Sequence, residues 1–159
     1  MYKMKRIVNC IIVLTFILTA NCQTGKNKQD PKSSDKEIKG EVSLLTNQTF
    51  KEKVFDYIAN KDWKYKGTVP CIVDFYADWC GPCRRVSPIL EQVAKDYAGK
   101  LIVYKVNTDN EQLLSSNLGI SSLPTILFVP ASGNPQVLYG AYPKETIIKV
   151  INEFLLIKK

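Results

Sequence analysis

Two cysteines separated by two residues are the side chains best suited to chemistry in this sequence. They are Cys80 and Cys83, in the run Trp-Cys-Gly-Pro-Cys at 79–83, directly after an apolar run at 71–77. A run rich in Val, Ile, Phe and Tyr predicts a buried strand, and the residues that follow the cysteines repeat with helical spacing. The two cysteines are therefore expected to open a helix at the end of a strand.

That position favours a reactive thiol. The first turn of a helix leaves backbone N–H groups unpaired and carries the positive end of the helix dipole, so it stabilises a thiolate. We expect Cys80 to be the acidic thiol. Cys83 lies three positions further, on the same helix face and close enough to form a disulfide. Pro82 fits the first turn because its missing N–H would have no partner there.

A zinc site and a purely structural disulfide are the alternatives for this pair. Four-coordinate zinc needs a second Cys or His pair, and the sequence has no His and no second such pair. We therefore predict no metal site and no cofactor. A catalytic pair that switches between dithiol and disulfide is favoured over a structural disulfide.

Length and composition indicate one globular domain. The chain has 159 residues, of which 45% are hydrophobic and 23% charged. Its formal net charge is +7, but three of the basic residues fall within the first 22, which hold no acid. The remaining basic residues are not interleaved with stacking aromatics on one face, so nucleic-acid binding is not predicted.

The first 22 residues have the layout of a secretory signal peptide. Positive charges precede an apolar stretch at 7–20, and small or polar residues follow up to Cys22. An uncleaved membrane anchor is the alternative, but the 14 residues of this stretch would span only about 21 Å of a hydrocarbon core roughly 30 Å thick. We therefore expect export to the periplasm.

The end of this segment, Thr-Ala-Asn-Cys at 19–22, resembles the lipobox of bacterial lipoproteins. The resemblance favours lipidation of Cys22 and anchoring to a membrane over simple cleavage to a soluble protein, and two acyl chains suffice for a stable anchor. Thr19 and Asn21 depart from the usual lipobox residues. Residues 23–40 are polar and lysine-rich, which predicts a flexible linker, and the folded domain is expected at 41–159.

Apolar periodicity within this domain predicts an α/β fold. Strands are expected at 42–45, 71–77, 101–106, 125–129 and 136–139. Helices are expected from 46 or 47 through Ile58, from the cysteines to Gly99, at 109–118 and at 144–157. This order of elements implies a central mixed sheet with helices on both faces.

With these elements in place, the chain resembles thioredoxin over residues 41–158. The likeness is carried by separate motifs in the same order, namely Val73 to Cys83, Pro88-Ile89-Leu90, Lys105 to Asp109, Leu123-Pro124-Thr125 and Gly140-Ala141. The resemblance implies the thioredoxin fold and a thiol–disulfide oxidoreductase with protein disulfides as substrates. We expect it to act as a monomer.

Asp74 lies in the middle of the apolar strand, where a carboxylate is costly unless it is paired or neutral. Its pKa should therefore be raised, although nearby backbone groups could satisfy it. Thioredoxins have a buried Asp at the matching position, so the resemblance gives Asp74 the role of handling the proton of Cys83. Lys105 matches the lysine that neighbours this acid in the family; the alternative is a solvated lysine on a strand.

The resemblance also implies a substrate groove. Pro124 matches a cis proline that faces the cysteines, although only about 5% of X–Pro bonds in folded proteins are cis. Leu123 would present its backbone to an extended substrate, as an added strand does. The expected substrate-binding residues are Trp79, Gly81, Pro82, Leu123, Pro124 and Gly140.

The predicted mechanism is attack of the Cys80 thiolate on a substrate disulfide, followed by resolution of the mixed disulfide by Cys83. Gly-Pro between the cysteines matches the reducing thioredoxins. We therefore favour reduction of exported disulfides, with electrons from a transmembrane or other thiol donor. The alternatives are a cytochrome-maturation, oxidising or isomerising protein, or a non-enzymatic thioredoxin-like binding module. Cys71 is expected to be a small core residue.

Overall fold

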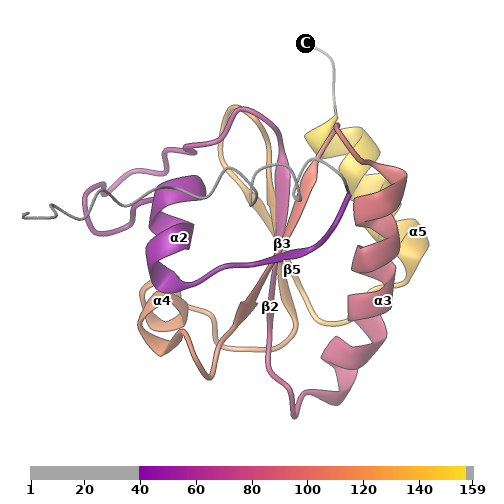
Figure 1. The fold of residues 1–159 in the computed structure, drawn as a ribbon, viewed down its shortest axis with the longest axis horizontal. Helices are drawn as coiled ribbons and strands as arrows, with labels where there is room; N and C mark the ends of the chain where they lie inside the picture. The colour runs from indigo at the N-terminus through magenta and orange to yellow at the C-terminus, as the bar shows by residue number, and fades with distance from the viewer. Residues whose placement is uncertain (1–39, 157–159) are drawn as a thin grey trace, which may run out of the picture.

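A mixed five-stranded sheet forms the centre of this computed structural model, which describes residues 40–156 (Figure 1). The strands are β1 (Ser43–Leu44), β2 (Cys71–Tyr76), β3 (Ile102–Asn107), β4 (Thr125–Val129) and β5 (Gln136–Tyr139). Their order across the sheet is β1-β3-β2-β4-β5. The strands β1, β3 and β2 are parallel, and β4 runs antiparallel to both of its neighbours. The predicted mixed sheet is confirmed.

Helices cover both faces of the sheet (Figure 1). They are α2 (Asn47–Lys53), α3 (Gly81–Asp96), α4 (Gln112–Asn117), α5 (Lys144–Val150) and a π-helical segment η1 (Ile151–Leu155). The core cluster on one face includes residues of α2 and α4, and the cluster on the other includes residues of α3, α5 and η1. This is the three-layer arrangement that the order of elements predicts.

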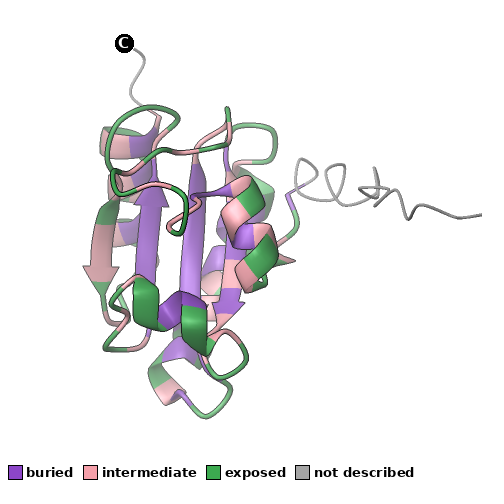
Figure 2. Cartoon of the chain, turned by 90° about the vertical axis from the view of Figure 1, so that its left-hand side faces the viewer, coloured by how far each residue is buried: buried purple, intermediate pink, exposed green. Residues whose placement is uncertain are grey.

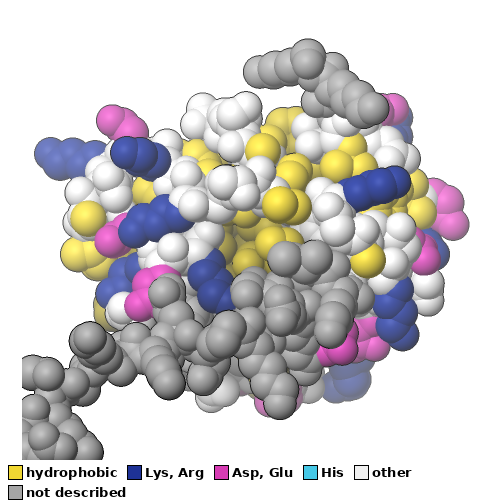
Figure 3. Space-filling model, turned by 45° about the horizontal axis from the view of Figure 1, so that its top comes forward, with side chains coloured by type: hydrophobic (Ala, Val, Ile, Leu, Met, Phe, Trp, Pro, Cys, Tyr) yellow, Lys and Arg dark blue, Asp and Glu magenta, His cyan; other side chains and the backbone are white. Residues whose placement is uncertain are grey.

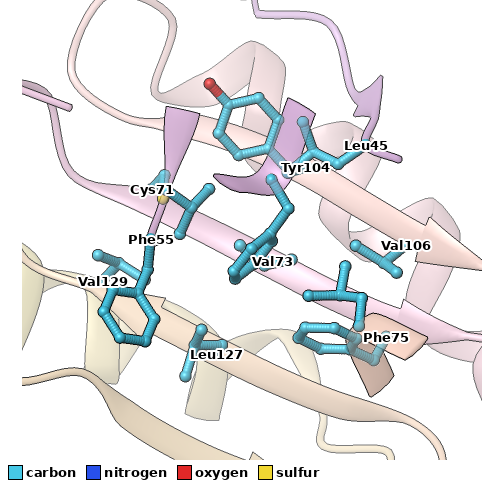
Figure 4. Packing of buried hydrophobic residues seen from close by; sticks show 12 residues of the cluster. Leu45, Phe55, Cys71, Val73, Phe75, Tyr104, Val106, Leu127 and Val129 are labelled. Atoms are coloured by element: carbon cyan, nitrogen blue, oxygen red, sulfur yellow. The ribbon is translucent and has the colours of Figure 1, made fainter. Parts of the chain in front are cut away.

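Strand β2 is buried on both faces because it is central and its side chains alternate between the two core clusters (Figure 2). Val73 and Phe75 pack on the α2 side with residues of β3 and β4, as Figure 4 shows. Ile72 packs on the α3 side. Asp74 shares the strand face of Ile72, so the sheet places a carboxyl group in the layer beneath α3.

Helix α2 is shorter than the apolar spacing predicts. It ends at Lys53, and Ile58, which was expected on its buried face, is 66% exposed. The Asp56 side chain accepts hydrogen bonds from the backbone N–H groups of Ile58 and Ala59, at 3.2 and 3.1 Å. An Asp that binds the backbone two and three residues further on stabilises a turn in place of a helix. The predicted extension through Ile58 is therefore wrong.

The C-terminal helix also differs from its prediction, because its regular part ends at Val150 and a π-helical turn follows. Ile147, Ile151 and Leu155 are all buried and lie four residues apart. In an α-helix each such step overshoots a full turn by about 40°. The wider π turn, in which the Leu156 N–H donates to the Ile151 carbonyl at 2.9 Å, offsets this drift. Helix α4 is likewise shorter than the predicted 109–118.

Gly40 packs against the C-terminal half of α3. Its φ is +80°, and a Cβ atom at this position would lie 2.7 Å from the Ala94 carbonyl oxygen. Only glycine combines that backbone conformation with such a close approach. The chain therefore enters the described domain beside the end of α3 that is remote from the cysteines (Figure 1).

Surface charges of both signs are interspersed on the face that Figure 3 shows. Within residues 40–156, no helix has the length and apolar character needed to cross a membrane. The predicted signal peptide, the lipidation site at Cys22 and nearly all of the predicted linker lie outside the described residues.

Candidate active site

The two cysteines lie where β2 leads into α3. Cys80 is the N-cap of α3, and its Sγ accepts a hydrogen bond from the Cys83 backbone N–H at 3.2 Å. The two residues form a disulfide, with their Cα atoms 5.3 Å apart. They are only 3% and 2% exposed. The helix end therefore directs an N–H donor and its positive dipole at Cys80, which stabilises negative charge on that sulfur.

Two further chain segments approach the sulfurs. The Leu123–Pro124 peptide bond is cis, and Leu123 packs against the cluster formed by Ala77, Cys80 and Cys83. The Gly140 N–H donates to the Pro124 carbonyl at 2.7 Å. The residues expected to form the substrate groove from the β4 and β5 segments thus lie together, next to the disulfide.

Trp79 projects from the rim of the site. Its side chain is a large hydrophobic group that is 70% exposed, and its indole N–H donates to the Asp109 carboxylate at 3.0 Å. This hydrogen bond links the ring to the segment that follows β3. Gly81 and Pro82 form the first turn of α3 next to it.

Asp74 is fully buried, and neither of its carboxylate oxygens accepts a hydrogen bond from the described residues. The alternative that nearby backbone groups satisfy this carboxyl is therefore not observed. Burial raises the pKa of Asp74 to about 6, and the positive charge of Lys105 acts in the opposite direction. A carboxyl group with such a pKa exchanges its proton near neutral pH.

Lys105 is the register partner of Asp74 on the neighbouring strand β3. Its ammonium group does not form an ion pair with Asp74; it donates to the Ser87 hydroxyl at 3.0 Å and lies 4.4 Å from the centre of the Tyr76 ring. The predicted proximity of the two residues is present, but other side chains hold the ammonium group.

A surface hollow opens beside the second cysteine. It is lined by Tyr76, Ala77, Asp78, Cys83, Arg84, Ser87 and Lys105. Neither Leu123 nor Pro124 lines this hollow, so it is separate from the region around the cis peptide bond.

Comparison with known proteins agrees with this geometry. The thioredoxin family model matches residues 41–153. This chain belongs to the thioredoxin family. A thioredoxin of Borreliella burgdorferi is 47% identical over 110 residues, which cover 69% of this chain and 94% of that protein. Thioredoxin 1 of a Nostoc species is 38% identical over 114 residues, which cover 72% and 97% of the two chains.

The structures of thioredoxins are similar as well. A crystal structure of chloroplastic thioredoxin z has a TM-score of 0.62 and 28% identity, over 71% of this chain and 93% of that one. The fold is thus the thioredoxin fold, and the chain is a thiol–disulfide oxidoreductase that acts on protein disulfides.

Sequence reasoning missed two side chains of this thioredoxin site, Asp109 and Ser87. Asp109 stands in the Lys105 to Asp109 motif, which indicated family membership but not a bond to Trp79. Ser87 lies four residues after Cys83, a spacing that places both on one face of a helix. That spacing was the available signal for Ser87.

A further prediction concerns Cys71. Cys71 is buried in the core cluster on the α2 side, as predicted for a small core residue. In the part of the chain that the structure describes, no group of three or more His, Cys, Asp or Glu side chains is arranged to hold a metal ion.

Proposed function

We propose that this thioredoxin is exported and reduces the disulfides of other exported proteins through Cys80 and Cys83. The observation that carries the proposal is the Cys80 sulfur at the N-terminus of α3, where it accepts the Cys83 N–H. Gly81 and Pro82, in place of the His-containing pairs of oxidases and isomerases, favour the reducing direction.

In the proposed reaction the Cys80 thiolate attacks one sulfur of the substrate disulfide, and the other substrate sulfur leaves as a thiolate. The Cys83 thiolate then attacks the Cys80 sulfur and releases the second substrate thiolate. Two electrons have passed to the substrate, and Cys80 and Cys83 are joined in a disulfide. A membrane-embedded or other thiol donor restores the dithiol.

We assign the proton of the Cys83 thiol to Asp74. The carboxyl has a pKa of about 6, so at neutral pH it is ionised and can accept that proton. Cys83 and Lys105, the register partner of Asp74, line the same hollow. This arrangement supports a proton path on the interior side of the disulfide.

The substrate is proposed to bind as an extended segment along Leu123 and Gly140, beside Pro124. Backbone groups at a strand end recognise a chain without regard to its side chains, which suits a reductase with many substrates. The exposed ring of Trp79 and the first turn at Gly81 and Pro82 would form the opposite wall.

The reduction potential of the Cys80–Cys83 pair tests the proposed direction. We expect a value near the thioredoxin reference of about −270 mV, measured by equilibration of the purified domain with glutathione or dithiothreitol. A value near the oxidase reference of about −120 mV would overturn it and make the protein a donor of disulfides.

Export and lipidation at Cys22 require a separate test on the full chain. When it is produced in a bacterial host, the protein should be recovered in the membrane fraction, and a Cys22→Ser variant should not be processed to the lipidated form. Cys10→Ser is the matched control, since this residue lies in the apolar run and should leave with the signal. Equal processing of all three proteins would refute lipidation.

A further inference from the structure

Two side chains, Ser87 and Tyr76, hold the ammonium group of Lys105. The Ser87 Oγ accepts its hydrogen bond at 3.0 Å, and the face of Tyr76 lies 4.4 Å away, within the range of a cation–π contact. Lysine has a flexible four-carbon stem and loses rotamer entropy when its head group is fixed. The position of the charge therefore depends on these two contacts.

The lysine and the two side chains that hold it come from three different elements. Ser87 lies on α3 one turn after Cys83, Tyr76 ends β2, and Lys105 lies on β3. All of them line the hollow beside Cys83. Asp74 lies two residues before Tyr76, so both side chains are on the same face of β2. Lys105 thus lines the hollow and is also the register partner of the strand position that carries the buried carboxyl.

The other charged groups of the hollow are engaged elsewhere. Arg84 donates to the Asp78 carbonyl oxygen at 3.3 Å, and the Asp78 carboxylate accepts from the Asn107 amide at 3.2 Å. Cys83 is in the disulfide, and Tyr76 is a neutral phenol whose pKa is raised by burial. From β4, the residue opposite Asp74 is Ile126, which carries no charge. Among the described residues, Lys105 is the charge that acts on Asp74.

We propose that Ser87 is a positioning residue which, together with the Tyr76 ring, holds the Lys105 ammonium group beside Asp74 and Cys83. This inference rests on the proton-transfer role proposed for Asp74. Without the Ser87 hydroxyl, the lysine head group would extend through the open hollow into water. The ionised form of Asp74 would then lose part of the positive charge that favours it.

The test is a pH titration of Asp74 in the oxidised domain, followed through the NMR signal of its carboxyl carbon. For Ser87→Ala we expect the midpoint to rise by a few tenths of a pH unit to about one unit, in the direction opposite to the effect of a nearby cation. Ser87→Thr keeps the hydroxyl and should titrate like the parent. Alanine is the best helix former, so the variant should fold.

A double variant separates positioning from a general structural effect. Lys105→Gln should raise the midpoint more than Ser87→Ala, and adding Ser87→Ala to Lys105→Gln should produce no further rise. An unchanged or lowered midpoint in Ser87→Ala would overturn the proposal. The proposal would also be overturned if Ser87→Ala raised the midpoint of Asp74 equally in the parent and in Lys105→Gln.

The titration uses no substrate, so its outcome does not depend on whether the chain acts as a reductase. If the reduction potential refutes the proposed direction, the effect of Ser87 on Asp74 can still be present. In a disulfide-reduction assay, the acidic limb of the pH profile should move to higher pH in Ser87→Ala and remain in place in Ser87→Thr.

Discussion

Replacement of Cys83 by serine should turn this thioredoxin into a trap for its substrates. The Cys80 thiolate would still attack a substrate disulfide, but no thiolate would remain to attack the mixed disulfide. Multiple turnover should fall to background, while each molecule retains one covalently bound substrate. Gel electrophoresis with and without reductant, after incubation with a protein disulfide, measures the trapped species.

The matched variant is Cys80→Ser, which should trap nothing, because the helix N-terminus and the Cys83 N–H stabilise a thiolate at position 80 and not at position 83. Trapping by Cys80→Ser in place of Cys83→Ser would reverse the assigned roles. In the trapped complex, NMR signals of Trp79, Leu123 and Gly140 should change most. Changes confined to other surfaces would contradict the proposed groove.

Replacement of Asp74 by asparagine should stabilise the folded domain at pH 8. The pKa of this carboxyl is about 6 in the folded state and about 3.9 in an unfolded chain. The folded state therefore binds the proton more tightly, and stability falls as pH rises through this window. A difference of two pKa units corresponds to about 3 kcal/mol, which Asn, with no charge to bury, should recover above pH 7.

Urea unfolding of the oxidised proteins at several pH values measures this gain. It should be near its maximum at pH 8, fall through pH 4, and largely vanish by about pH 3, where both states of the parent are protonated. Asp96→Asn is the control, because Asp96 binds Lys144 at the surface and its pKa is lowered. A gain in Asp74→Asn that is the same at pH 4 and pH 8 would show that ionisation is not its cause.

The strands and the position of the cysteines were predictable because their signals are local. The run at 71–76 is apolar except for Asp74 and forms β2, and the Cys-Gly-Pro-Cys sequence opens α3 as its helix-start signals indicate. The end of α2 was not predictable from apolar spacing, since Ile58 has the right position for that helix. The turn held by the Asp56 carboxylate determines where the helix stops.

Within the site, the burial of Asp74 could be predicted, because it is one charged residue in an apolar strand. The contacts of its neighbour Lys105 could not be predicted in this way. Lys105 meets Ser87 from an element 18 residues earlier, and Trp79 meets Asp109 across 30 residues. Such pairs depend on how helices and strands pack, which periodicity does not specify. The π turn at Ile151 has the same origin, since it adjusts a helix to the sheet beneath it.

The close packing of Gly40 on α3 determines how a tethered domain would be oriented. The chain enters beside Ala94, while Cys80 lies at the opposite end of the same helix. The helix rises over 14 residues from Cys80 to Ala94, which separates these two points by about 21 Å. On a chain anchored through its N-terminal part, the reactive sulfurs therefore face away from the attachment point. On such a chain they would be accessible to partners that approach from the side opposite the attachment point.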